Sequence, residues 1–333
     1  MVQGTFRRYE SRPMHTKTSA RLSRVLGQTP RGGFQTLAAL PGNIKAIEAA
    51  LQFAHSVQPF VVVVGPPGWG KTHLMVSTRE AMSARGSEPE ITSALDWIMN
   101  PARFDSNAPL LLDDVQDVLR HPRARHQFRL ALERRIRSRR PTMICFNGHR
   151  ISHTLRAFLP LSREWTVALI SEPSSDEREL VVRQIASSEG MLLSKAIVRL
   201  IARHLHGNGR SVSGALQRLK LYRDDWSAAD DVCPACGILM PYLLCDDGWD
   251  PRDEVHEAVS RVVSDPDTVI DVSAYVLWQL VGLTEGDVAT FLKIGPSSVY
   301  NRSNQVKRRL SEEEFAAVFA DCKSAVLQNF ERV

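Results

Sequence analysis

Residues 61–72 read Val-Val-Val-Val-Gly-Pro-Pro-Gly-Trp-Gly-Lys-Thr. Four β-branched residues followed by a glycine-rich turn predict a buried strand that leads into a helix. The last eight residues have the spacing G-x-x-x-x-G-K-[ST], whose glycines let backbone N–H groups surround a phosphate chain at a helix N-terminus. An ordinary strand-to-helix turn is the alternative, but it does not require lysine and threonine at these offsets. The stretch therefore predicts a nucleoside triphosphate site.

Residues of this loop have distinct expected roles. Lys71 is expected to reach the β- and γ-phosphates of ATP, and the Thr72 hydroxyl is expected to bind Mg²⁺. ATP and Mg²⁺ are therefore the predicted cofactors. The residues that we expect to bind the nucleotide are Gly65, Gly68, Trp69, Gly70, Lys71, Thr72 and His73.

A second apolar run ends in two acids, Asp113 and Asp114. Such a run predicts a buried strand with carboxylates at its C-terminal end, where open α/β sheets bind ligands. We expect Asp113 to hold the metal ion, and Asp114 to orient or activate the attacking water. Asn147 follows a further apolar run and is a candidate contact for the γ-phosphate or that water. A turn-forming role before Gly148 is the alternative for Asn147.

Taken together, these residues resemble the AAA+ ATPases, and within them the DnaA/Hda family of bacterial replication initiators and their regulators. The stretches that carry the resemblance are residues 34–46, 65–74, 110–116, 162–165 and 208–216. The resemblance implies an α/β fold in which a parallel P-loop sheet is followed by a helical lid. It also implies slow ATP hydrolysis that acts as a switch.

The resemblance also implies two arginine contacts to ATP. Arg163 corresponds to the arginine finger that acts on the ATP of a neighbouring subunit, and Arg210 to the sensor 2 arginine that contacts the γ-phosphate of its own subunit. A guanidinium stays charged and matches phosphate oxygens with a planar fork. A surface ion pair is the alternative for either residue.

The C-terminal third predicts two helices, over residues 283–292 and 296–309, with a tight turn between them. This is the pattern of a helix-turn-helix, whose second helix reads the major groove of DNA. A solvated helix hairpin is the alternative. The family's Gly-x-Arg-Asp-His-Ser-Thr-Val stretch is not matched at 295–299, so its DNA sequence preference cannot be transferred. The candidate DNA contacts are Ser297, Ser298, Asn301, Arg302, Lys307 and Arg308.

An acidic, loop-like segment over residues 224–252 contains three cysteines, Cys233, Cys236 and Cys245. Cys-Pro-x-Cys resembles half of a zinc site, which needs four ligands in all. Buried thiols and a redox pair are the alternatives. Zinc is therefore a further candidate cofactor.

Length, composition and charge limit the classes of protein to which the chain can belong. The chain has 333 residues, a formal net charge of +5 and five cysteines. No apolar run approaches the ~18 residues that span a bilayer, so we expect no membrane association and a bacterial cytoplasmic location. The expected parts are a flexible basic arm (1–31), an α/β nucleotide-binding subdomain (32–172), a helical lid (173–223), an acidic linker (224–252) and a helical DNA-binding domain (253–333).

The sequence thus predicts an ATP-dependent protein that binds double-stranded DNA and resembles a replication initiator or its regulator. We expect a homo-oligomer when ATP is bound, and another replication or recombination protein as a further partner. One alternative is an accessory ATPase that assists a transposase. Another is a DNA-binding regulator in which ATP only stabilises the fold.

Overall fold

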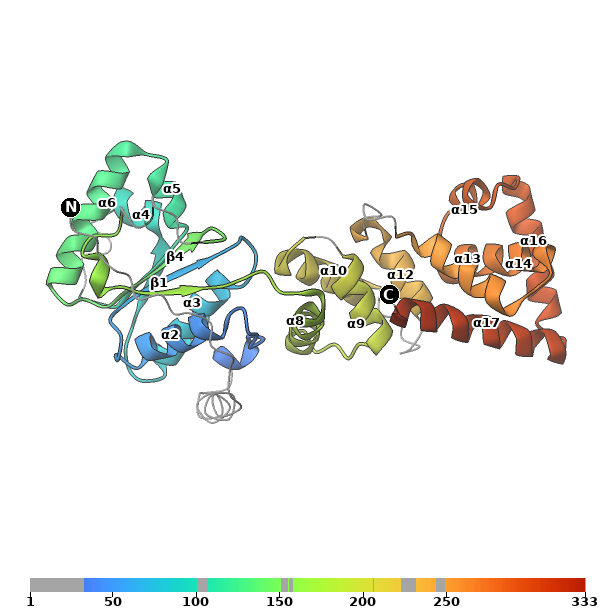
Figure 1. The fold of residues 1–333 in the computed structure, drawn as a ribbon, viewed down its shortest axis with the longest axis horizontal. Helices are drawn as coiled ribbons and strands as arrows, with labels where there is room; N and C mark the ends of the chain where they lie inside the picture. The colour runs from blue at the N-terminus through green and yellow to red at the C-terminus, as the bar shows by residue number, and fades with distance from the viewer. Residues whose placement is uncertain are drawn as a thin grey trace. The chain divides into compact units, whose positions relative to one another are not determined.

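The computed structural model describes residues 33–100, 107–150, 155, 158–205, 207–222, 232–243 and 249–332 (Figure 1). The chain divides into two compact units, with the boundary between Pro173 and Ser174. The basic arm expected at residues 1–31 lies outside the described residues. Over the described ranges, no helix combines the length and the apolar character needed to cross a membrane.

The first unit is built on a five-stranded parallel sheet with the strand order β2-β3-β4-β1-β5. Every residue of the central strand β1 is buried, as expected for a parallel strand that is covered on both faces. The predicted α/β P-loop sheet is confirmed. The strands are β1 (Phe60–Gly65), β2 (Glu90–Ser93), β3 (Leu110–Asp113), β4 (Thr142–Asn147) and β5 (Thr166–Leu169).

Helices cover both faces of this sheet (Figure 1). Because side chains alternate along a strand, Val61 and Val63 pack with the helices of one face, while Val62 and Val64 pack with those of the other. The first face is covered by α2 (Ile44–Ala54) and α3 (Lys71–Ser83), next to a short helix η1 (Phe34–Thr36). The second face is covered by α4 (Ala94–Met99), α5 (Val115–Leu119) and α6 (Pro122–Arg137), and η3 (Ser162–Glu164) precedes β5.

The second unit is helical and has one continuous apolar core, which extends from Val182 to Phe330. Side chains from its early and late helices are buried together in that core, so these helices stabilise one another. The helices are α8 (Ser175–Ser188), α9 (Lys195–His204), α10 (Gly209–Leu221), α12 (Val232–Leu239), η4 (Met240–Tyr242), α13 (Pro251–Val262), α14 (Pro266–Tyr275), η5 (Val276–Leu280), α15 (Glu285–Leu292), α16 (Pro296–Arg309) and α17 (Glu313–Arg332).

The prediction of a loop-like linker at residues 224–252 is wrong for the middle of this segment, which forms α12 and η4. Val232, Ala235, Cys236 and Leu239 recur at helical spacing and are buried in the core of the second unit. Gly237 approaches the backbone of Val281 so closely that a Cβ atom there would overlap the Val281 carbonyl. The acidic residues on both sides of this segment suggested a loop, but the residues between them have helical apolar spacing and form a helix.

Candidate nucleotide-binding site and DNA-reading helix

The loop between β1 and α3 is shaped to surround an anion. Gly68 and Gly70 adopt positive φ angles of 78° and 88°, and Gly70 is the residue that precedes the first turn of α3. Residues with a Cβ rarely adopt this backbone conformation. The first backbone N–H groups of a helix have no partner within it, so α3 begins with donors suited to a phosphate.

Lys71 is folded into this loop and is only 6% exposed. Its Nζ donates hydrogen bonds to the carbonyl oxygens of Gly65, at 2.9 Å, and Pro66, at 2.7 Å. The ammonium group is thereby held inside the turn. Gly65 is itself required by close packing, because a Cβ atom there would lie 2.8 Å from the Cβ of Ile170.

Thr72 and Asp113, the two predicted Mg²⁺ ligands, lie in direct contact. The Thr72 hydroxyl at the start of α3 donates a hydrogen bond to Oδ2 of Asp113, at the end of β3, over 2.6 Å. The sheet topology brings these residues together although they are 41 positions apart in the sequence. A hydroxyl and a carboxylate supply the hard oxygen ligands that Mg²⁺ prefers, so the residues present fit this metal.

Asp114 is held in one orientation by two side-chain amides. Its Oδ1 accepts hydrogen bonds from Nε2 of Gln116, at 2.9 Å, and from Nδ2 of Asn147, at 3.3 Å. Gln116 Oε1 in turn accepts the backbone N–H of Asn147 at 3.1 Å. The structure therefore brings Asp114 and Asn147 together. The sequence analysis assigned no role to Gln116, which lies two residues after Asp114.

His73 and Trp69 differ in what they contact. The Nε2 of His73 lies 2.6 Å from the Thr36 hydroxyl of η1, so the segment before the loop is tied to α3. Partial burial lowers the pKa of His73, and the charge of Glu80 opposes this shift. Trp69 is buried in the apolar core that α2 and α3 form with the sheet, so its side chain serves packing. Thr36 is a contact that the sequence analysis missed.

The two arginines assigned from the resemblance lie in different units. Arg163 is exposed on η3 of the first unit. Arg210 is exposed in the first turn of α10 in the second unit, where the Asn208 side chain accepts its backbone N–H at 3.0 Å. Their expected contacts with ATP stay predictions.

In the second unit, α15 and α16 form the expected pair of helices around a turn. Thr284 caps α15, and Lys293 adopts the left-handed conformation that ends it, with a φ of 55°. Proline stands at the first position of α16. Of the candidate DNA contacts, Ser297, Asn301, Lys307 and Arg308 are exposed and Ser298 is half-buried.

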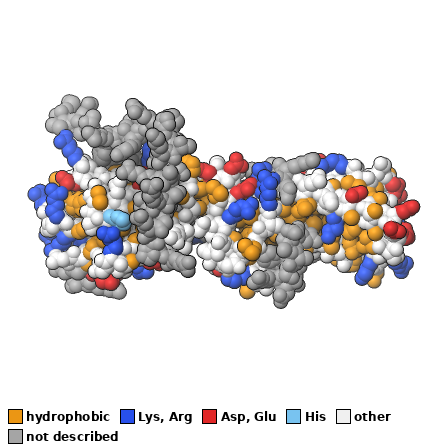
Figure 2. Space-filling model, turned by 90° about the horizontal axis from the view of Figure 1, so that it is seen from below, with side chains coloured by type: hydrophobic (Ala, Val, Ile, Leu, Met, Phe, Trp, Pro, Cys, Tyr) orange, Lys and Arg blue, Asp and Glu red, His pale blue; other side chains and the backbone are white. Residues whose placement is uncertain are grey.

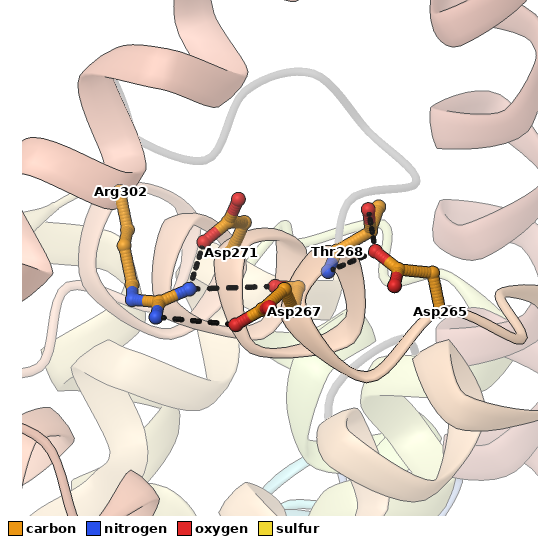
Figure 3. Close-up of polar contacts among 5 residues, drawn as sticks. All are labelled: Asp265, Asp267, Thr268, Asp271 and Arg302. Carbon is orange, nitrogen blue, oxygen red and sulfur yellow. Dashed lines mark hydrogen bonds and ion pairs between the residues drawn. The ribbon is translucent and has the colours of Figure 1, made fainter.

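Arg302 is placed differently from the other candidates. Its guanidinium forms ion pairs with Asp271 and, at 3.4 Å, with Asp267, both on α14 (Figure 3). Asp271 is only 5% exposed, so this pair is largely enclosed between the two helices. Arg302 thus joins α16 to α14, and its expected contact with DNA stays a prediction. The sequence could not reveal partners 31 and 35 residues away.

The cysteines do not form a metal cluster in the part of the chain that the structure describes. Cys233 and Cys236 are buried on α12. The described residues hold no group of three or more His, Cys, Asp or Glu side chains suited to a metal ion. Cys245, the third predicted ligand, lies outside the described residues.

Exposed cations gather on part of the first unit. On α6 of the first unit, the arginine side chains that face solvent are Arg123, Arg125, Arg129, Arg134 and Arg137. Lys and Arg side chains gather at the end of the first unit that lies at the left in Figure 2. Such a surface suits a polyanion and agrees with the net charge of +5.

Comparison with known proteins gives a consistent result. No family model matches the sequence. The chromosomal replication initiator protein DnaA of Dechloromonas aromatica is 27% identical over 214 residues, which cover 58% of this chain and 46% of that protein. DnaA of Thermotoga maritima is 22% identical over 257 residues, covering 70% of this chain and 58% of its own length. The chain therefore spans about half the length of these relatives.

A solved structure shares the fold. The crystal structure of domain III of Thermotoga maritima DnaA is matched over 65% of this chain and 99% of its own, with a TM-score of 0.54 and 22% sequence identity. Sequence similarity and fold similarity thus lead separately to the same proteins. The chain is therefore similar in sequence to the DnaA proteins over part of its length, and it shares the fold of DnaA domain III.

Proposed function

We propose that this chain is an ATP-dependent DNA-binding protein that acts like a replication initiator or a regulator of initiation. The observation that carries the proposal is the contact between the Thr72 hydroxyl and the Asp113 carboxylate, next to the loop that encloses Lys71. Two strands and one helix bring these groups to the same end of the sheet, where parallel α/β sheets bind nucleotides. The names of the curated relatives support the role in replication initiation.

In this proposal each side chain of the site has one task. Lys71 exchanges its two carbonyl partners for the β- and γ-phosphates, while the N–H groups at the start of α3 hold the phosphate chain. Thr72 and Asp113 hold Mg²⁺, which when bound neutralises phosphate charge. Asp114 accepts a proton from the attacking water, and the Gln116 and Asn147 amides keep its carboxylate in position.

Nucleotide state then controls assembly. Arg163 of one copy contacts the ATP of the next copy, and Arg210 contacts the ATP of its own copy. An ATP-bound homo-oligomer forms on double-stranded DNA, α16 contacts the duplex, and slow hydrolysis reverses the assembly. Another replication or recombination protein is a further partner in this scheme.

Titration calorimetry of the full chain with ATP and Mg²⁺ tests the nucleotide site. We expect binding by the wild type and its loss in Lys71→Ala. Arg79→Ala, which removes an exposed cation from the same helix, is the matched control and should bind normally. Well-folded wild type that gives no heat with ATP or ADP would refute the proposal.

Footprinting on defined and random duplexes, with ATP, ADP or no nucleotide, tests the link to DNA. Protection of defined sites that depends on ATP supports an initiator-like switch. Coating of DNA without sequence preference would instead indicate an accessory ATPase. Protection that is the same with ATP, with ADP and without nucleotide would indicate a regulator in which ATP only stabilises the fold. Hydrolysis is measured in the same samples.

A further inference from the structure

One face of α16 carries a row of amide side chains. Val299, Ser303 and Val306 are buried on the opposite face of the helix. Since a helix advances about 100° per residue, the residues facing away from that buried side are Ser297, Asn301, Asn304, Gln305 and Arg308. Asn301, Gln305 and Arg308 are exposed, and Asn304 is half-buried.

The orientation of this face is fixed by contacts on its flanks. Arg302 forms its ion pairs with Asp267 and Asp271 of α14 (Figure 3). On the other flank, the Tyr300 ring lies 5.9 Å from the Trp278 ring of η5. Contacts of this kind on two flanks oppose rotation of α16 about its axis, so the amide row keeps its direction. A side chain that must meet a base edge needs such preorganisation.

The charge pattern of α16 suits a nucleic acid. Residues 296–309 contain no aspartate or glutamate, and cations are concentrated in the last turn. Lys307 and Arg308 are exposed there. Cations at these positions can neutralise phosphates on either side of a groove, and this helix has no carboxylate that would repel the phosphates.

A carboxamide matches one base in particular. Asn and Gln present a hydrogen-bond acceptor and a donor side by side, which pair with the N6 amino group and the N7 atom of adenine in the major groove. Asn301 and Gln305 are one helical turn apart, about 6 Å along the axis. That distance is close to two base-pair steps of about 3.4 Å each.

We propose that Asn301 and Gln305 read adenines about two base pairs apart in the major groove of duplex DNA. The chain then prefers sites with A·T pairs at these positions. Lys307 and Arg308 hold the backbone and add affinity for any sequence. This inference rests on the proposed DNA-binding function.

Selection from a pool of randomised duplexes, using the full chain with ATP, provides the first test. We expect enriched sites to contain adenines at two positions with the stated spacing. Asn301→Ala and Gln305→Ala should each lose the preference at one position and lower affinity for the selected site about 5- to 150-fold. Affinity for unrelated duplex should change little, because alanine keeps the helix and the phosphate contacts remain.

Matched controls separate base reading from general binding. Gln328→Ala removes an exposed glutamine from α17 of the same unit and should leave both affinity and preference unchanged. Lys307→Ala and Arg308→Ala should weaken binding to all sequences alike, and each should reduce the slope of log affinity against log salt by about 1.

A modified base tests the contact itself. Replacing one selected adenine by 7-deazaadenine removes the N7 acceptor, so wild type should bind more weakly. The variant without the amide that contacts the replaced adenine should show no further loss of affinity. Two outcomes would overturn the inference and leave the proposed function standing. One is binding to duplex DNA without a preference for adenine. The other is an equal loss of affinity on 7-deazaadenine substitution in wild type and in both variants. No duplex binding under any nucleotide would refute the DNA-binding function itself.

Discussion

Asp114 shows how a single residue depends on partners from elsewhere in the chain. It adopts a left-handed backbone conformation, with a φ of 53°, directly after β3. This conformation is uncommon outside glycine, asparagine and aspartate. It turns the carboxylate toward the amides of Gln116 and Asn147. The backbone conformation and the two amide contacts together fix the position of this carboxylate.

Asp114→Asn tests this arrangement. The variant should bind ATP normally, because Lys71, Thr72 and Asp113 remain, but hydrolysis should fall about 10²- to 10⁴-fold through loss of the base. Single-turnover hydrolysis of radiolabelled ATP measures the effect. Asp117→Asn, three residues further along on α5, is the control and should hydrolyse ATP at the wild-type rate. Equal rates in all three proteins would remove Asp114 from the mechanism.

His73 should make stability sensitive to mild acid. Its pKa in the folded chain lies below the ordinary value of 6.5, so between these two pKa values the unfolded chain binds more protons. The contribution of His73 to the free energy of unfolding is therefore constant above pH 6.5, and it makes the chain less stable as the pH falls below 6.5. His73→Gln should show a smaller decrease between pH 7.5 and 5.5 in urea unfolding, whereas His126→Gln, exposed on α6, should behave like wild type. An unchanged decrease in His73→Gln would contradict this reading.

Individual residues were predictable to the extent that they belong to a local spacing pattern. Lys71 and Thr72 follow from the glycine spacing before them, and Asp113 from the apolar run that it ends. Gln116 and Arg302 were not predictable in the same way, because their roles depend on partners on other elements. Sequence spacing reports neighbours along the chain, whereas these contacts arise only after the elements have packed.

Among the elements, α12 is where the prediction failed. Acidic residues on both sides suggested an exposed linker, yet Val232, Ala235 and Leu239 form an apolar stripe of only two turns. Such a short stripe is a weak signal without knowledge of the surface that it packs on. The helices α15 and α16 were easier to predict, since Thr284 and Pro296 mark their starts locally.

Two glycine substitutions test how tightly α12 is packed. Gly237→Ala places a Cβ atom against the Val281 carbonyl, so it should destabilise the chain by about 1–3 kcal/mol or more. Gly214→Ala in the interior of α10 meets only an ordinary contact, 3.9 Å from the Tyr242 ring, and should stabilise by about 0.5–1 kcal/mol. Urea unfolding midpoints compare the two. If Gly237→Ala is as stable as Gly214→Ala, α12 is not packed as described.

For the whole molecule, mixing two inactive variants tests the proposed role of Arg163. Lys71→Ala cannot bind ATP but keeps its arginine, while Arg163→Ala binds ATP but lacks the arginine. If the arginine acts between copies, a mixture on DNA should hydrolyse ATP faster than either variant alone, because one copy supplies the nucleotide and the other the guanidinium. Hydrolysis by Arg163→Ala alone at the wild-type rate would contradict the assignment.

The single apolar core of the second unit has a mechanical consequence. Val212 of α10 and Val299 of α16 belong to the same buried cluster, so the helices that carry Arg210 and Asn301 are connected through shared packing. Under the proposed function, a shift of α10 that follows loss of the phosphate at Arg210 would be passed to Asn301 through the side chains of this core. The helical unit would then convert loss of one phosphate into movement of the residues proposed to contact a base pair.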